Sequence, residues 1–280
     1  MNRGIITIAV GAKYIRQAKY LALSCILNTP GTIRAVITDK PEALSDFYDM
    51  VIPYNEDYGS PFTLKLQLHR FTPFTKTLFI DADSLVVHPV DAYWELLEQR
   101  VFVYAGDMAT DGIWYMDIAK TLKRLDADWL PKFNSGMFLF SSGNTVTALF
   151  DTALAYMRDK DSEIGYFRDT MLPDEPFLAM ALAKLKIEPF PDYGRFSRTL
   201  IDAKKVQINV VKRVARFIKQ GIPVTPFIVH FCGRFGGVFY FIEKLRLHWY
   251  FTSIAQSILS AMLDFIRKLK GESGSFGKAK

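Results

Sequence analysis

Two aspartates placed two positions apart are the strongest chemical feature of the sequence. Asp81 and Asp83 directly follow the apolar residues 77–80, which we expect to form a buried strand. In an extended chain these two side chains point to the same side, where two carboxylates repel unless a cation lies between them. Ligands of open α/β sheets bind at the carboxyl ends of the strands. The pattern therefore predicts a divalent metal with hard oxygen ligands, shared with a diphosphate.

Three further segments could contribute residues to the same site. Asn134 and Ser135, followed by a glycine, stand at the start of the apolar residues 137–140 and offer neutral hydrogen bonds to hydroxyl groups. His230 ends the apolar residues 227–230 and is a candidate third metal ligand. Lys65 lies in a helical pattern just before Asp81. Each has an ordinary alternative: a turn, a structural histidine and a solvated lysine.

The elements that would position these residues alternate along the first half of the chain. Strand patterns occupy residues 5–10, 33–38, 50–53, 77–80 and 101–105, and helical patterns occupy 14–27 and 63–71. The second half adds a strand at 137–140, a helix at 145–157, a helix starting near Pro173 and a strand at 227–230. This alternation predicts an α/β fold with a largely parallel sheet that is covered on both faces.

Composition excludes several classes of protein. Half of the 280 residues are hydrophobic and 23% are charged, which excludes extensive disorder. The two cysteines, Cys25 and Cys232, exclude a disulfide scaffold and favour a reducing compartment. No apolar run approaches the roughly 20 residues of a membrane span, and no convincing signal peptide begins the chain. We therefore expect a cytoplasmic protein.

Basic residues gather late in the sequence. The formal net charge is +6, and residues 203–219 alone contain six Lys or Arg and no acid. Residues 234–280 contain eight Lys or Arg against three acids. This distribution predicts an anionic partner, either a phosphate-bearing small molecule or an anionic membrane surface. No nucleic-acid-binding motif is present, so nucleic acid is not an expected partner.

The C-terminal residues form a basic amphipathic pattern from 244 to 269. Its apolar residues recur every three or four positions: Leu247, Tyr250, Phe251, Ile254, Ile258, Met262, Phe265 and Leu269. Basic residues flank this face at both ends: Lys244, Arg246, Arg267, Lys268 and Lys270. Such a helix either lies at the interface of an anionic membrane or packs on the protein's own core. We expect a domain at 1–240 and a helix with a frayed tail at 241–280.

Four blocks in order resemble a known family. They are Leu64-Lys65-Leu66 with Thr72-Pro73-Phe74, then residues 78–86 around the two aspartates, then Phe133-Asn134-Ser135-Gly136, and finally His230-Phe231-Cys232-Gly233-Arg234. The chain is similar over residues 5 to 236 to glycosyltransferase family eight, which includes glycogenin and the bacterial lipopolysaccharide galactosyltransferases. This resemblance implies a GT-A fold, in which a Rossmann-like nucleotide-binding mixed sheet merges with a smaller acceptor half.

The resemblance also implies an activity and roles for individual residues. Members transfer a hexose from a UDP-sugar to a glycan or lipid-linked acceptor, with retention and with Mn²⁺ (or Mg²⁺) as cofactor. The implied metal ligands are Asp81, Asp83 and His230. The implied donor contacts are Lys65, Asp83, Asn134, Ser135, Gly233, Arg234 and, more loosely, Val10 and Tyr14. The implied catalytic acids are Asp107 on the donor sugar and Asp174 and Glu175 near the reacting carbon.

Two departures and two rival functions accompany this interpretation. Where the family carries lysine, proline and tryptophan after the histidine, this chain has Arg234-Phe235-Gly236-Gly237, so Arg234 is the expected substitute for the phosphate-binding lysine. Pro176 is also unusual for the family. Asp174 could be a helix cap instead of a catalytic acid.

The rival functions are a nucleotidyltransferase on a similar fold and a non-catalytic module that binds sugar nucleotides or membrane surfaces. An acceptor at the inner face of a membrane would follow from the membrane interpretation of the C-terminal helix.

Overall fold

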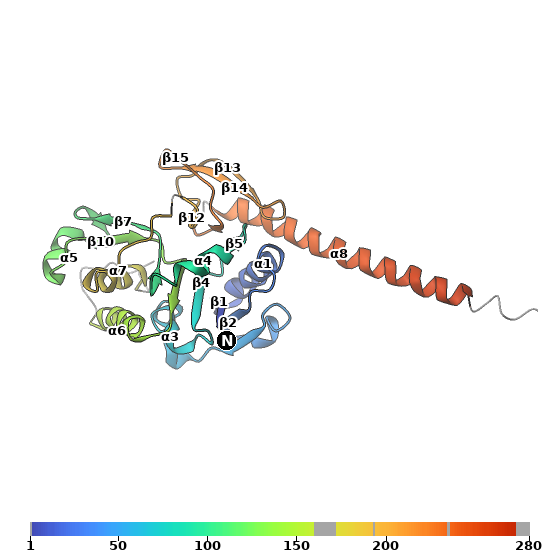
Figure 1. The fold of residues 1–280 in the computed structure, drawn as a ribbon, viewed down its shortest axis with the longest axis horizontal. Helices are drawn as coiled ribbons and strands as arrows, with labels where there is room; N and C mark the ends of the chain where they lie inside the picture. Colours follow the sequence, from blue (N-terminus) through green and yellow to red (C-terminus); the bar gives the residue numbers. More distant parts are fainter. Residues whose placement is uncertain (1, 160–171, 193, 234–235, 273–280) are drawn as a thin grey trace, which may run out of the picture.

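A six-stranded mixed sheet forms the centre of the protein. The computed structural model describes residues 2–159, 172–192, 194–233 and 236–272. The strand order is β3 (Met50–Pro53), β2 (Arg34–Thr38), β1 (Arg3–Ala9), β4 (Lys76–Ile80), β11 (Met137–Ser141) and β6 (Phe102–Val103) (Figure 1). The first four strands are parallel, and β11 is antiparallel to both of its neighbours. The predicted strands of the first half are thus all present.

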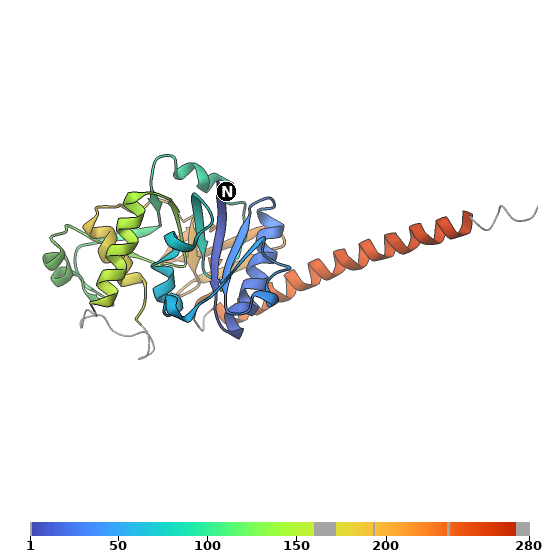
Figure 2. The same ribbon diagram turned by 90° about the horizontal axis from the view of Figure 1, so that it is seen from below.

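Alternation along the strands separates two cores. Leu78 belongs to a cluster that contains Leu21 and Cys25 of α1 (Ala12–Asn28). Phe79 points to the opposite face and belongs to a cluster with Phe138 and with Phe150 of α6 (Asn144–Arg158), which α7 (Glu175–Lys184) also joins. Figure 2 shows these helices on the two sides of the sheet. A sheet covered on both faces explains why its strands are continuously apolar.

The single helix predicted at 63–71 is wrong. The segment forms two short helices, α2 (Pro61–Lys65) and α3 (Leu68–Phe71). Leu64, Leu66 and Leu68 are all fully buried, and residues two apart cannot share one face of an α-helix. The break between α2 and α3 resolves this conflict.

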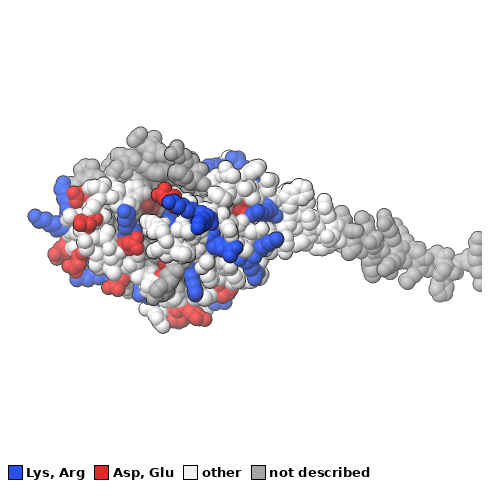
Figure 3. Space-filling view, turned by 90° about the horizontal axis from the view of Figure 1, so that it is seen from above, with Lys and Arg blue, Asp and Glu red and all other residues white. Residues whose placement is uncertain are grey.

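The sequence did not predict several short elements between residues 91 and 199. They are α4 (Asp91–Leu96), β7 (Gly106–Ala109), β8 (Ile113–Trp114), β9 (Met116–Asp117), α5 (Ile118–Leu125), β10 (Leu130–Phe133) and β12 (Ser197–Thr199). The basic residues 203–219 contain two strands, β13 (Lys204–Asn209) and β14 (Val214–Lys219). They form an antiparallel sheet with β15 (Ile222–Val224). Figure 3 shows Lys and Arg side chains gathered on this side of the molecule, near the base of the C-terminal helix.

The C-terminal helix is anchored at its base and projects beyond it. Helix α8 (Gly237–Glu272) begins before the expected domain boundary at residue 241. Glu243 accepts a hydrogen bond from the Val210 amide at 2.7 Å, Arg246 donates one to the Ile208 carbonyl at 2.7 Å, and Leu247 is fully buried. From Thr252 on, every described side chain is exposed, and the helix extends away from the body (Figures 1 and 2). Packing on the protein's own core therefore accounts only for the first turns.

Within the described part of the chain, no helix has both the length and the apolar character needed to cross a membrane.

Candidate active site and metal centre

Strand pairing brings the two aspartates and the histidine together. Asp81 follows β4, and Asp83 precedes β5 (Ser84–Val86). Strand β16 (Ile228–His230) pairs antiparallel with β5 and places His230 opposite Ser84. The Phe231 amide donates to the Asp83 carbonyl at 2.9 Å and extends this pairing past the site. Two segments far apart in sequence thus form one wall.

The three side chains form a compact set of potential ligands. One ligand atom from each of Asp81, Asp83 and His230 lies within 4.8 Å of the others. His230 Nε2 is 2.9 Å from Asp83 Oδ1 and 3.8 Å from Asp81 Oδ2. Carboxylate oxygens combined with one imidazole fit a divalent ion such as Mn²⁺ better than Ca²⁺, which prefers oxygen alone. The donor set therefore fits the expected cofactor.

Asn134 fixes which nitrogen of His230 faces the cluster. The Gly136 amide donates to Asn134 Oδ1 at 3.2 Å, so this atom is the carbonyl oxygen. His230 Nδ1 lies 2.7 Å from the same oxygen and must be protonated. Nε2 then faces the two aspartates, where the protonated ring donates to Asp83 Oδ1 at 2.9 Å, and it becomes a potential metal ligand when it loses that proton. Such an orienting partner is typical of metal-binding histidines.

Lys65 is a buried cation rather than a solvated one. Its Nζ lies 3.0 Å from Asp81 Oδ1, 3.3 Å from Asp174 Oδ2 and 3.3 Å from Ser135 Oγ. Burial opposes its charge, but Asp174 and Asp81 outweigh burial and raise the pKa of Lys65. Lys65 therefore holds one metal-ligand carboxylate and one deeper carboxylate in place.

The two aspartates of the cluster differ in electrostatics. Burial raises the pKa of Asp81, although Lys65 and His230 oppose the effect. Burial would also raise the pKa of Asp83, but His230, with smaller contributions from Lys65 and Lys13, holds it below its usual value. Burial lowers and the two aspartates raise the pKa of His230, and the aspartates prevail. Asp83 is thus the carboxylate that stays charged most readily.

The two acids at the start of α7 have different surroundings. Asp174 occupies the N-cap position of α7 and is 2% exposed, but its side chain makes no capping hydrogen bond and instead lies 3.3 Å from Lys65 Nζ. Glu175 is partly exposed and accepts hydrogen bonds from Tyr115 Oη at 2.9 Å, Asn134 Nδ2 at 2.8 Å and the Ser135 amide at 3.0 Å. Burial raises the pKa of Glu175, and Asp174 adds to the increase. Sequence reasoning missed Tyr115, and no motif marks it.

Gly136 makes room for the His230 ring. A Cβ at this position would lie 2.4 Å from His230 Nδ1 and 2.8 Å from Asn134 Oδ1. Both contacts are far closer than van der Waals distance, so only glycine fits between the two side chains.

We expect Gly136→Ala to weaken Mn²⁺ binding at least about tenfold, because the new methyl group displaces His230 from the aspartates. Overpacking should also cost about 1–3 kcal/mol of stability. Titration of Mn²⁺ by calorimetry measures the first effect, and thermal unfolding measures the second. Gly237→Ala is the matched control, because a Cβ there meets nothing within 4 Å. Equal Mn²⁺ affinity in both variants would contradict the prediction.

The other predicted site residues come from other segments of the chain. Asp107 is exposed on β7, and it forms no hydrogen bond or ion pair with the cluster within the described chain. Val10 follows β1, and Tyr14 is 40% exposed on α1. Gly233 is exposed after His230, and Arg234 lies outside the described residues. Their roles remain predictions.

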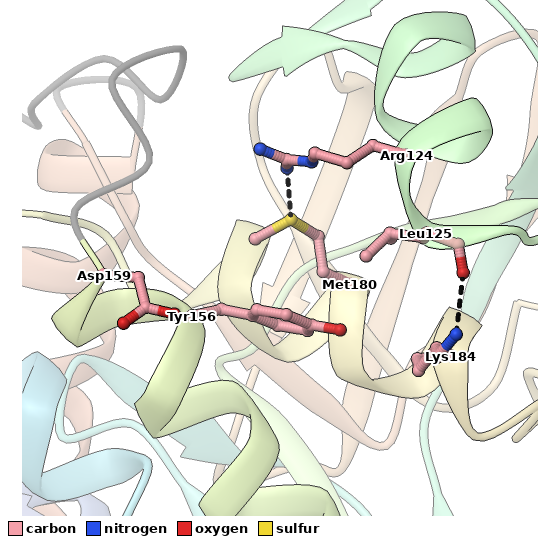
Figure 4. Close-up of a pocket in the computed structure, with 6 residues that line it drawn as sticks. All are labelled: Arg124, Leu125, Tyr156, Asp159, Met180 and Lys184. Carbon is pink, nitrogen blue, oxygen red and sulfur yellow. Dashed lines mark hydrogen bonds between the residues drawn. The ribbon is translucent and has the colours of Figure 1, made fainter.

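A separate cavity of about 310 Å³ lies among α5, α6 and α7 (Figure 4). None of its lining residues belongs to the cluster. Arg124 already donates to Met180 Sδ at 3.4 Å, and Lys184 donates to the Leu125 carbonyl at 3.0 Å. The cations of this cavity therefore already serve the packing of the helices.

Comparisons with known proteins agree with this architecture. No family model matches the sequence. Glycogenin-1 of Caenorhabditis elegans is 28% identical over 193 residues, 60% of this chain and 39% of that protein, so the chain spans about two fifths of that relative's length. The galactosyltransferase LgtC, solved with donor and acceptor sugar analogs, superposes with a TM-score of 0.57 at 16% identity and covers 82% of this chain and 87% of LgtC. The bifunctional glycosyltransferase WbbM gives a TM-score of 0.51 at 13% identity, with 83% and 46% covered. These matches confirm the GT-A fold and support a family-eight-like assignment.

Proposed function

We propose, for a chain with a GT-A fold and a family-eight-like sequence, that the protein is a metal-dependent retaining glycosyltransferase. It moves a hexose from a UDP-sugar to a glycan or lipid-linked acceptor. The observation that carries the proposal is the Asp81, Asp83 and His230 cluster, built at the carboxyl end of a central strand. Ligand sites of open α/β sheets lie at such strand ends. The sequence similarity to glycogenin-1 supports the same activity.

Each part of the site has a task in this reaction. A divalent ion held by the cluster would neutralise the charge that develops on the departing diphosphate. Lys65 keeps Asp81 oriented, and Asn134 holds Nδ1 of His230 so that Nε2 faces the two aspartates. Ser135, Asp107, Gly233 and Arg234 are the proposed donor contacts, with Val10 and Tyr14 near the base. Because its amide already contacts Glu175 and His230, Asn134 acts chiefly as a positioning residue.

The test is product release from UDP-sugars with Mn²⁺, repeated with EDTA. Release of UDP that EDTA abolishes supports the transferase. Release of pyrophosphate from UTP and a sugar phosphate would instead identify a nucleotidyltransferase. Tight binding of UDP-sugars with neither product would identify a binding module.

Glu175 is the better candidate for the face of the sugar opposite the leaving group. It is partly exposed and held by three donors, whereas Asp174 is buried against Lys65. We expect Glu175→Gln to lower kcat about tenfold to a hundredfold, because hydrogen bonds to a charged group contribute about 1.5–3 kcal/mol. Asp174→Asn should act mainly on stability. Turnover and thermal unfolding of both variants separate these effects, and the reverse pattern would exchange the two roles.

We also propose that α8 attaches the enzyme to an anionic membrane surface that displays the acceptor. Residues 247–263 contain no charged residue, and Ile254, Ile258 and Met262 are 39%, 56% and 58% exposed. Lysines and arginines flank this stretch in the sequence. An exposed apolar helix face between basic flanks suits a membrane interface.

We expect the full chain to float with vesicles of phosphatidylcholine and phosphatidylglycerol and to be released by about 0.5 M salt, because salt screens attractions of about 1 kcal/mol per basic residue. Truncation after Thr252 should abolish flotation while keeping the anchoring contacts of Glu243 and Leu247. Ile258→Glu should weaken it, and Gln256→Glu, on the opposite side of the helix, should have less effect. Flotation of the truncated chain at full strength would contradict the proposal.

A further inference from the structure

A basic pocket lies between α1 and the base of α8, outside the metal centre. Its volume is about 330 Å³, within the range of about 300–1,000 Å³ that small-molecule sites occupy. One wall comes from a face of α1 and the other from the first turns of α8. Its lining residues are Lys13, Arg16, Gln17, Lys19, Tyr20, Tyr240 and Lys244. Four of the seven are cations and none is an acid.

The cations of this pocket have no directly paired acid among the described residues. In the described part of the chain, no carboxylate forms an ion pair with Lys13, Arg16, Lys19 or Lys244. Three of them lie near aromatic rings: Lys13 Nζ is 5.1 Å from the ring centre of Tyr14, Lys19 Nζ is 5.3 Å from that of Phe47, and Lys244 Nζ is 5.9 Å from that of Tyr20. Four cations around one hollow, with no paired acid among the described residues, create a strong local preference for an anion.

The lining of the pocket also includes one uncharged amide, Gln17. The Oε1 atom of Gln17 is buried and has no hydrogen-bond partner among the described residues. Because this atom is almost closed to solvent, a ligand in the hollow would reach it only after the Gln17 side chain turns, so the preference for an anion rests on the four cations.

The pocket also adjoins the metal centre. The Tyr240 ring packs edge-on against Phe231, with ring centres 5.4 Å apart. Phe231 directly follows His230, and its amide binds the Asp83 carbonyl. At the other end of the pocket, Lys13 is near enough for its charge to act on Asp83. A ligand in the pocket would thus lie beside the reaction site.

We propose that this pocket binds a phosphate group of the sugar acceptor, separately from the donor diphosphate. The acceptor is then a phosphorylated glycan or lipid-linked glycan, whose phosphate is held by Arg16 and Lys244 while its hydroxyl reaches the donor sugar. The role as acceptor site rests on the proposed transferase function, whereas the anion site itself does not.

Binding of glycerol phosphate, a phosphate ester with neighbouring hydroxyls, tests the site in the presence of EDTA, which keeps divalent ions out of the metal centre. We expect Arg16→Glu and Lys244→Glu each to weaken binding at least about tenfold by calorimetry. Lys123→Glu on α5 makes the same charge change at a distant exposed position and should leave the affinity unchanged. Equal affinity in all four proteins would overturn the anion site, whatever the outcome of the UDP-release assay.

A second arm identifies the source of the phosphate. With a competent UDP-sugar, glycerol phosphate should inhibit transfer to acceptor more strongly than it inhibits donor hydrolysis without acceptor. Equal inhibition of both would place the anion in the donor site and overturn the proposal.

Vesicles containing phosphatidic acid are tested with the chain truncated after Thr252. If the truncated chain binds these vesicles, loses this binding on Arg16→Glu and does not bind glycerol phosphate, the pocket is a surface for membrane headgroups. That result would also overturn the proposal.

Discussion

Asp83→Asn should reduce turnover at least about a hundredfold while the protein stays folded. Asp83 lies 2.9 Å from His230 Nε2 and is the carboxylate of the cluster that ionises most readily. Asparagine keeps the shape but removes a negative ligand, so the cluster should hold a divalent ion more weakly. A factor of one hundred in rate corresponds to about 2.7 kcal/mol of lost transition-state stabilisation.

UDP release measured across a range of Mn²⁺ concentrations checks this prediction. Part of the loss should be recovered at high Mn²⁺, because weaker binding is overcome by mass action. Asp128→Asn is the matched control, since Asp128 is exposed on the loop after α5. Near-full activity of Asp83→Asn at low Mn²⁺ would contradict the assignment of Asp83 as a metal ligand.

Lys65→Met should be the most destabilising exchange in the site. It keeps most of the side-chain volume but leaves Asp81 and the buried Asp174 without their cation. Removing one partner of a buried ion pair costs about 3–5 kcal/mol. For a chain of this size, that corresponds to a fall in Tm of roughly 6–20 °C. Lys123→Met, at an exposed position, should change stability by no more than about 0.5 kcal/mol.

The loss of stability in Lys65→Met should depend on pH in a defined direction. Burial raises the pKa of Asp81, and without the opposing charge of Lys65 it rises further above that of the unfolded chain, so the charge of Asp81 destabilises the folded state at neutral pH. Protonation removes that penalty as the pH falls toward about 4. Thermal unfolding at several pH values, with EDTA present, should show the gap between variant and wild type narrowing on acidification. A gap that widens toward low pH would contradict the role of Lys65 as a buried counter-ion.

Local patterns in the sequence were enough to predict the central architecture. The short apolar run at residues 77–80 favours a buried strand and the periodicity of residues 14–27 favours a helix, and the structure confirms both as β4 and α1. The carboxylates of Asp81 and Asp83 could likewise be placed at a strand end, since they directly follow the strand. The GT-A fold was implied by blocks of residues in order, and the structural comparisons confirm it.

The environments of individual polar residues were set by the tertiary structure and could not be predicted from the sequence. The sequence left Lys65 as either a donor contact or a solvated lysine, whereas the fold buries it at the end of α2 against two carboxylates. Tyr115 carries no motif, and only the fold brings its hydroxyl to Glu175. Helix α8 packs on the body at Leu247 and leaves it by Thr252, although its apolar periodicity continues unchanged. Periodicity records which residues share a face, whereas the partner of that face is set by segments far away in the sequence.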